Sequence, residues 1–480
     1  MAYAAILIIF TAFSFLENVF TTARIKTRCH IPECENSMEQ NLTPLWLAQA
    51  VPLSKYGYDN CHRFAASNSS NSSAPTNSIN SCPSILFDHS LIEPCEEFIY
   101  ENKNTIVYDF GLACSEWRRS MIGSVRMLGM MVAMPLVGFV SDLRGRRTAL
   151  LISVFCKGSI GITRYFANSY TYFIISEFLE GALASGTFSC IYLLLMETVG
   201  PRYRVGTGAF ISTSFAVGHM LLGWLSWAVP HWRNLTLLCY APQFILLLIY
   251  SRKISESPRW HITKGCYDKA EKILKQMART NGKQLSEKSV QLLRQTRNGK
   301  GRAQSIKNYQ TEPNLVVLVF RHKPMLLRCL VSPLQWITFS LIYYGLSINS
   351  INLNIGSKYL NHMAVTFIEI PGYLLALALL NRIGRKPVLT GGFWVCGACQ
   401  IGYIFTPAGH PNLSLALYVL SKCCISAVAM SLHIYTSELY PTPHRHRLSS
   451  VSASIGRLGA IIAPLTPAFV SSQFQYLYVL

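Results

Sequence analysis

The chain has 480 residues, of which 50% are hydrophobic and only 14% are charged, and its formal net charge is +20. An average soluble domain carries about 25% charged residues, so this composition excludes an ordinary soluble or disordered protein and indicates a polytopic membrane protein. We attribute the basic excess to cytosolic loops, where Lys and Arg collect in membrane proteins, and predict no nucleic-acid partner.

Apolar stretches of membrane-spanning length recur along the whole chain. About 20 apolar residues cross the hydrocarbon core, and such a segment is helical because its backbone groups must bond internally. In chain order the stretches cover residues 3–20, 120–140, 148–166, 171–195, 208–228, 235–251, 326–346, 359–380, 388–406, 413–435 and 449–468. Residues 474–480 could begin a further span but are too short to cross. We therefore expect an all-α fold of about eleven spans with the last span missing.

Two long polar segments predict the orientation. Residues 21–117 carry six Lys and Arg against eleven Asp and Glu, whereas residues 252–324 carry seventeen against five. The positive-inside rule places the first segment outside the cell and the second in the cytosol. The predicted order is a first span (1–20), an outer loop (21–117), the rest of an N-terminal helix bundle (118–251), a cytosolic loop (252–324) and an incomplete C-terminal bundle (325–480). Residues 1–20 lack the basic start of a signal peptide, which favours a retained span over a cleaved leader.

The outer loop has features of a secreted segment. It contains three glycosylation acceptors, at Asn41, Asn68 and Asn71. An even number of cysteines in an oxidising compartment predicts up to three disulfides, in any of fifteen pairings, and free thiols are the alternative. These cysteines are Cys29, Cys34, Cys61, Cys82, Cys95 and Cys114.

Two pairs of charged motifs recur at nearly the same offset. Residues 138–147 (GFVSDLRGRR) follow the second span and residues 381–386 (NRIGRK) follow the eighth, with an offset of 239 residues from Asp142 to Asn381. A Glu stands seven residues before an Arg after the fourth and tenth spans, with an offset of 241 residues from Glu197 to Glu438. This repetition predicts two parallel six-helix halves, as in secondary transporters.

The same motifs predict a gate at the cytosolic face. Acidic and basic groups at helix ends can form charge-assisted bonds that break between conformational states, although the arginines could instead serve only to set the orientation. The expected gating residues are Asp142, Arg146, Arg147, Glu197, Arg204, Arg385, Glu438 and Arg445.

Together these motifs resemble the organic cation, anion and carnitine transporter family of the major facilitator superfamily, over nearly the whole chain. Further family-like features are the cysteine-bearing outer loop and the segments CSEW (114–117), ESPRW (256–260), YYG (343–345) and ELYPT (438–442). Arg126 and the segment EFLEG (177–181) resemble the arthropod organic cation and carcinine transporter-like branch. Asn381 stands where the family usually has Asp, which weakens the second motif. The family's cytosolic N-terminal tail and last span are missing, so we expect a shortened chain.

Ionisable residues inside the predicted spans are candidates for the substrate path, because a charge in the membrane is costly without a cavity or a partner. They are Arg126, Lys157, Arg164, Glu177, Glu180, Glu369, Lys422 and Arg457. Arg164 lies near a span end and could extend to the interface. Glu177 and Glu180 lie on one helical face, where they could pair with Arg126 or Lys157 or attract a cationic substrate.

Arg457 is the most specific of these candidates. The resemblance places it where transporters of simple cations have Asp and transporters of anions and carnitine have Arg. A guanidinium can hold a substrate carboxylate, or it could pair inside the membrane with Glu369. Tyr343, Tyr344 and Trp336 could offer ring faces to an amine or serve only in packing.

The sequence therefore predicts a secondary transporter that moves small organic cations or zwitterions, of the carnitine or carcinine kind, across the plasma membrane. It has no phosphate loop, metal-ligand motif or nucleophile signature, so we predict no enzyme activity, metal or cofactor. The alternatives are an organic anion transporter and a truncated membrane protein that does not transport. The sequence makes no prediction about oligomeric state.

Overall fold

The computed structural model describes residues 2–35, 41–54, 57–67, 82–200, 203–287, 290–291, 293, 319, 321–353, 357–407, 410–440 and 445–466. They form two compact units, a helical unit of Met1–Glu17 and Met121–Leu480 and a smaller unit of Asn18–Ser120. Each unit is described by itself.

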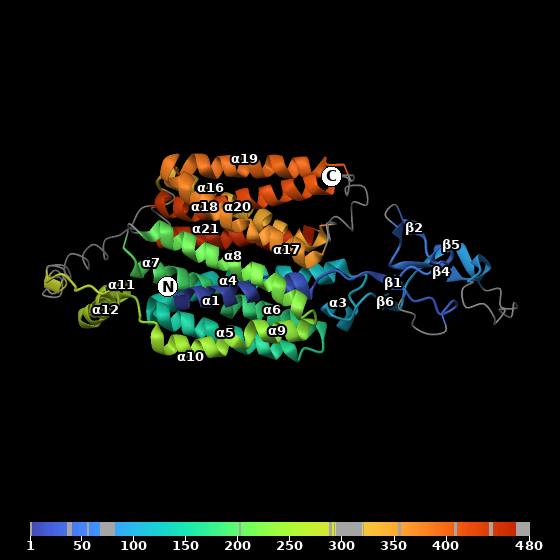
Figure 1. Ribbon diagram of the computed structural model, residues 1–480, viewed down its shortest axis with the longest axis horizontal. Helices are drawn as coiled ribbons and strands as arrows, with labels where there is room; N and C mark the ends of the chain where they lie inside the picture. Colours follow the sequence, from blue (N-terminus) through green and yellow to red (C-terminus); the bar gives the residue numbers. More distant parts are fainter. Residues whose placement is uncertain are drawn as a thin grey trace. The chain divides into compact units, whose positions relative to one another are not determined.

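The first half of the helical unit contains helices drawn in blue to yellow-green in Figure 1. Apolar runs of spanning length supply most of them, and Pro242 and Pro258 begin two of the shorter ones, where the first turn tolerates proline. The helices are α1 (Ala2–Thr21), α4 (Glu116–Arg144), α5 (Arg146–Tyr165), α6 (Tyr170–Ala184), α7 (Gly186–Thr198), α8 (Arg204–Ala228), α9 (Trp232–Tyr240), α10 (Pro242–Lys253), α11 (Pro258–Thr263) and α12 (Tyr267–Thr280).

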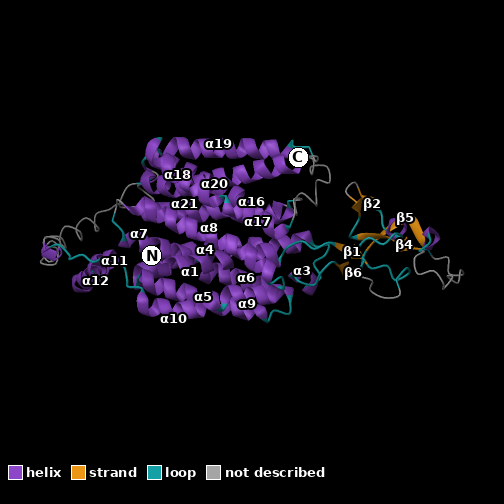
Figure 2. Cartoon of the chain, in the orientation of Figure 1, coloured by secondary structure: helices purple, strands orange, loops and turns teal. Residues whose placement is uncertain are grey.

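The second half of the helical unit contains the helices drawn in orange to red, and helix dominates both halves (Figures 1 and 2). They are α16 (Lys323–Asn349), α17 (Lys358–Phe367), α18 (Glu369–Arg382), α19 (Arg385–Ile404), α20 (Pro411–Leu439) and α21 (Arg445–Ile462), with 3-10 turns η3 (Ser350–Asn352) and η4 (Ala463–Leu465). The all-α fold predicted from the sequence is thus confirmed.

Nine stretches of the described chain are long and apolar enough to cross a membrane. They lie at Tyr3–Thr21, Glu116–Arg144, Tyr170–Thr198, Arg204–Ala228, Trp232–Ile249, Lys323–Asn349, Lys358–Leu380, Pro411–Thr436 and Leu448–Leu465. The structure also has helices of 20 residues at two further predicted spans, α5 and α19, but they do not reach the same apolarity. The start of a twelfth span, at 474–480, lies outside the described residues.

The two halves meet along α8. This helix packs against α17 and α18 of the second half, and its residues Ala209 and Ala216 belong to the same apolar core as Tyr373 and Val428. The core of the first half is separate and joins α1, α5, α7 and α8. Small side chains on α8 therefore let the halves approach closely along this helix, and α4 and α21 form a second contact between the halves, since Ser124 donates to the Ile461 backbone oxygen and Ser454 to that of Met131.

The smaller unit consists of short helices and paired strands held by disulfides. Its helical turns are α2 (Leu47–Ala50), η1 (Ser84–Leu86) and α3 (Ile106–Asp109). Its antiparallel strand pairs are β1 (Thr27–Cys29) with β6 (Phe98–Tyr100), β2 (Leu53–Ser54) with β3 (Gly57–Tyr58), and β4 (His62–Ala66) with β5 (Phe87–Pro94). Loop segments with few apolar residues need such cross-links because they bury little surface.

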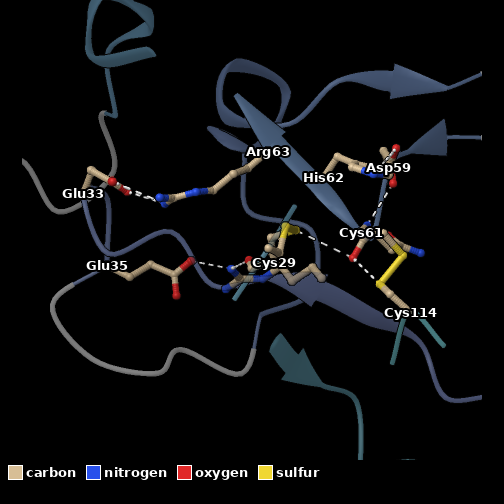
Figure 3. Close-up of a disulfide and its surroundings, with 11 residues drawn as sticks. Cys29, Glu33, Glu35, Asp59, Cys61, His62, Arg63 and Cys114 are labelled. Carbon is tan, nitrogen blue, oxygen red and sulfur yellow. Dashed lines mark hydrogen bonds and ion pairs between the residues drawn. A yellow bond between two sulfur atoms is a disulfide. The ribbon is translucent and has the colours of Figure 1, made fainter. Parts of the chain in front are cut away.

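All six predicted cysteines are paired in this unit. The disulfides are Cys29–Cys95, Cys34–Cys82 and Cys61–Cys114. Figure 3 shows the last of them beside two polar links, Asp59 with His62 and Glu33 with Arg63. Of the predicted glycosylation acceptors, Asn41 is exposed, whereas Asn68 and Asn71 lie outside the described residues. Glycosylation stays a prediction.

Candidate functional site

Arg457 lies on α21 where this helix packs closely against α16. A Cβ at Gly456 or Gly459 would overlap Trp336 or the backbone of Ile337, so glycine at both positions allows the close approach. The Arg457 side chain is half-buried, and its Nη1 donates to the Tyr344 hydroxyl at 2.6 Å. Among the described residues, no carboxylate lies within ion-pairing distance of this guanidinium.

Two groups of aromatic side chains near this arginine, one at Tyr344 and one at Trp336, contain residues from both halves. Tyr344 lies 5.8 Å from Phe15 of α1, measured between ring centroids. On α16, the Trp336 ring meets His433 of α20 edge-on at 4.7 Å, and Tyr192 of α7 lies 6.3 Å from the same histidine. We call Arg457, Tyr344, Trp336, His433, Tyr192 and Phe15 the central site. A solute held there would touch both halves, as alternating access requires.

Lys422 and Glu369, two other predicted substrate residues, neutralise each other. Both are completely buried, and Lys422 Nζ lies 3.0 Å from Glu369 Oε1. Lys422 also donates to Ser347 Oγ at 2.6 Å and lies 3.6 Å from the centre of the Tyr343 ring. The Tyr343 hydroxyl donates to Glu369 Oε2 at 2.9 Å. The ring face of Tyr343 is therefore occupied by a cation of the protein itself.

Glu177 lies in a second closed network, within the first half. Arg126 bonds Glu180 at 2.8 Å and Glu177 at 3.3 Å, and Arg164 bonds the same two carboxylates at 2.7 and 3.1 Å. Glu17 lies 3.4 Å from Arg164. Every member of this N-half charge network is at most 3% exposed. The expectation that Arg164 extends to the interface is wrong, since its guanidinium is buried against these acids.

Hydroxyl groups complete the N-half charge network. Tyr240 of α9 donates to Glu180 Oε2 at 2.8 Å, and Thr236 donates to Glu17. Arg126 also donates to the backbone oxygen of Ser14. Lys157 is buried nearby without a hydrogen bond or ion pair to any described residue. The network thus joins α1, α4, α5, α6 and α9 and leaves the two carboxylates of α6 fully engaged.

The first charged motif forms a small cluster at the junction of α4 and α5. Arg146 lies 2.9 Å from Asp142 and 3.3 Å from Glu197. Gly145 begins this turn with φ of 101°, a conformation that favours glycine. Arg204 makes no ion pair with Glu197 in the described part of the chain. Arg147 instead donates to the backbone oxygen of Ser251.

Glu256 holds the same turn from the segment after α10, a role that the sequence did not reveal. Its carboxylate accepts from the backbone N–H groups of Arg146 and Arg147 at 2.9 and 3.1 Å, where the positive end of the α5 dipole favours an anion. The Trp260 indole donates to the Asp142 backbone oxygen at 3.1 Å. The ESPRW segment thus fastens the GFVSDLRGRR turn.

The second charged motif contains a looser pair. Arg385 and Glu438 lie 3.0 Å apart, with side chains 43% and 49% exposed. The side chains of Asn381 and Arg445 lie outside the described residues. Within the described ranges, no group of three or more His, Cys, Asp and Glu side chains could hold a metal ion.

The site residues that the sequence analysis missed are His433, Tyr192 and Phe15. Each lies in an apolar helix, where an aromatic or a neutral histidine gives no charge signal. Only the packing of α20 against α16, and of α1 and α7 beside them, brings these rings to Arg457 and Tyr344.

Comparison with known families supports this architecture. The profile of the family described as "Sugar (and other) transporter" matches residues 57–480. The xylose transporter XylE has the same fold: its structure with 6-bromo-6-deoxy-D-glucose aligns with a TM-score of 0.55 at 16% identity, covering 74% of this chain and 79% of that one. The inward open conformation of XylE from E. coli aligns with a TM-score of 0.53 at 14% identity, and the alignment covers 76% of this chain and 83% of that one.

The sequence relatives are named as an organic cation transporter and as solute carriers. The Drosophila melanogaster "Organic cation transporter protein" is 30% identical over 94% of this chain and 80% of its own length. Mouse "Solute carrier family 22 member 6" is 29% identical over 96% of this chain and 81% of its own length. Rat "Solute carrier family 22 member 3" is 29% identical over 86% of this chain and 73% of its own length.

Proposed function

Because the chain belongs to the sugar (and other) transporter family, and within the major facilitator superfamily to the organic cation transporter family, we propose that it carries small organic zwitterions across the plasma membrane. The substrate binds at the central site through a carboxylate on Arg457, and the two halves expose that site to either side in turn. The disulfide-linked unit supports an oxidising, extracellular side for the loop that carries it.

The observation that carries this proposal is the difference between Arg457 and the other ionisable groups of the helices. Glu177, Glu180 and Glu369 are engaged by basic side chains. Arg457 is half-buried, and among the described residues its guanidinium donates only to the Tyr344 hydroxyl. A guanidinium without a carboxylate partner in a low-dielectric site is stabilised by a carboxylate that arrives with the substrate.

The aromatic members of the central site support a zwitterion over a plain anion. The Tyr344 ring already lies 5.8 Å from the Arg457 guanidinium, but Phe15 beside Tyr344 and Trp336 on the same helix carry further rings, and a substrate ammonium within about 6 Å of such a ring face is stabilised. A second candidate is an organic anion, which the positive charge of Arg457 also accommodates. Substrates of the carnitine kind, with a carboxylate and an amine in one molecule, use both features.

The test is uptake by an Arg457→Gln variant with a surface label. We expect uptake of a carnitine-type zwitterion to fall about 10- to 100-fold at equal surface expression, since a charged hydrogen bond is worth about 1.5–3 kcal/mol. Arg279→Gln, at an exposed arginine in α12 outside the central site and the charged motifs, is the control and should transport normally.

Uptake of a cation without a carboxylate, and of an anion without an amine, is measured beside the zwitterion. An unchanged profile in Arg457→Gln would remove this residue from substrate recognition. Preferred uptake of the plain anion would support the second candidate. The absence of any uptake, despite normal surface expression, would favour a membrane protein that does not transport.

A further inference from the structure

The central site, as defined by its described residues, contains one histidine, His433. It lies on α20 and is exposed, although its ring neighbours come from both halves of the helical unit. Arg457 of α21 lies within electrostatic reach of its ring. Neither the charged motifs nor the proposed carboxylate site assigns a role to this histidine.

One ring nitrogen of His433 has a fixed role. Nδ1 lies 2.8 Å from the backbone oxygen of Ala429, one helical turn earlier. A carbonyl oxygen can only accept, so Nδ1 carries the hydrogen. In the neutral imidazole, the other nitrogen, Nε2, then has a free lone pair and is an acceptor. No described residue donates to it.

The orientation of the ring is fixed by its surroundings. Trp336 meets the imidazole edge-on at 4.7 Å. The indole itself is held because its Nε1 donates to Thr436 Oγ1 at 3.1 Å, and that hydroxyl donates to the Leu432 backbone oxygen at 2.7 Å. The acceptor nitrogen is therefore held in place before a substrate binds, which reduces the entropy lost on binding.

Trp336 contacts both the helix that carries Arg457 and the ring of His433. Gly456, next to Arg457, packs directly on Trp336, and the His433 ring contacts the Trp336 ring. Because Arg457 also lies within electrostatic reach of His433, we expect one small molecule to meet the guanidinium donor and the imidazole acceptor together. Together they are complementary to a carboxylate and a nearby N–H or O–H group.

We propose that His433 Nε2 accepts a hydrogen bond from the substrate and so selects zwitterions that carry an N–H or O–H donor near the carboxylate. This inference rests on the proposed function and narrows its substrate class. Favoured substrates have a hydroxyl group or a primary or secondary ammonium. A quaternary ammonium compound without a hydroxyl leaves Nε2 without a partner and is rejected, because the lost hydrogen bond is not replaced.

The test uses three substrates of equal chain length. They are 4-(trimethylammonio)butanoate, the same compound with a 3-hydroxyl group (carnitine), and 4-aminobutanoate. The first has a carboxylate and a quaternary cation but no donor, and each of the others adds a donor. We expect the wild-type protein to take up both donor-bearing compounds about tenfold more efficiently than the first, since one hydrogen bond supplies a factor of this order.

His433→Phe keeps a flat ring but removes the acceptor. Its expected result is a loss of uptake that is about tenfold larger for the two donor-bearing compounds than for 4-(trimethylammonio)butanoate, so that the preference disappears. His433→Gln keeps an acceptor oxygen and should restore part of the preference. His410→Phe, on the exposed histidine just before α20, is the matched control and should keep the full preference.

Ligand-induced stabilisation of the purified protein gives the same comparison without transport. The inference is overturned if the wild-type protein does not prefer the donor-bearing compounds. It is also overturned if His433→Phe keeps the preference or weakens all three substrates equally, which would indicate a packing role. If none of the three compounds is bound or transported, or if Arg457→Gln handles them normally, the proposed function fails as well.

Discussion

The helical unit contains ionisable side chains in two very different settings. In the N-half charge network, Arg126 and Arg164 are bonded to Glu177 and Glu180, and all four are buried. In the central site, Arg457 is half-buried and, within the described part of the chain, bonded only to the Tyr344 hydroxyl. An ionisable residue in a membrane helix is thus a poor guide to the substrate path on its own, because its available partners decide whether its charge is free.

The largest effect is expected from breaking the network. Glu180 accepts bonds from Arg126, Arg164 and Tyr240, so Glu180→Gln leaves two buried guanidinium groups poorly compensated. Removing one partner of a buried ion pair costs about 3–5 kcal/mol. We expect little protein at the cell surface and a strongly lowered melting temperature in detergent.

A control separates this result from a general effect of losing a carboxylate. Glu101 is exposed, so Glu101→Gln should express and melt like the wild-type protein. Normal stability of Glu180→Gln together with selective loss of uptake would mean that Glu180 contacts substrate.

The next largest loss of stability is expected from breaking the buried ion pair of the second half, Lys422 with Glu369. Lys422→Met should leave Glu369 as a buried carboxylate without its cation and cost about 3–5 kcal/mol. The double variant with Glu369→Gln removes both charges, and we expect it to recover most of the lost stability. The measurement is a double-mutant cycle on melting temperature and surface expression.

Uptake by the double variant tests whether this pair also serves substrate. If Lys422 and Glu369 serve only to stabilise each other, the double variant should take up a zwitterion at a near-normal rate. Selective loss of cation uptake by a stable double variant would contradict this view and identify Glu369 as a cation site.

The fold was predictable from the sequence because long apolar runs and the repeated motifs have direct physical meaning. The apolar length requires a helix, and the constant offset indicates two like halves. The cysteine count predicted three disulfides but not which cysteines pair, since the pairing depends on how the strands of the smaller unit come together.

The site was predictable only in part. Arg457, Tyr344 and Trp336 stood out by charge, by family resemblance or by aromatic type, and the structure brings them together. The sequence singled out Arg457 by resemblance, but it gave no signal that Lys422 is paired with Glu369, because that pair forms only when α18 packs against α20. It also gave no signal for His433, whose role depends on a bond to Ala429 and on the neighbouring Trp336.

The smallest effects are expected at the gating motifs. Asp142 is 75% exposed, and an exposed ion pair contributes about 0.2–1 kcal/mol. Asp142→Asn should therefore express normally and change mainly the transport rate. Glu197 is 14% exposed and bonds the same arginine, so Glu197→Gln should lower the melting temperature more than Asp142→Asn does.

The ion pair of the second charged motif can be compared with that of the first. Arg385 and Glu438 are both nearly half exposed, so Glu438→Gln should affect stability no more than Asp142→Asn does. Turnover at saturating substrate, measured for all three variants at equal surface expression, separates gating from packing. If the motifs act as a gate, turnover changes in variants whose melting temperature does not. If turnover falls only where stability falls, the motifs serve packing and orientation, and Arg146 is bonded to Glu197 and Asp142 for that reason alone.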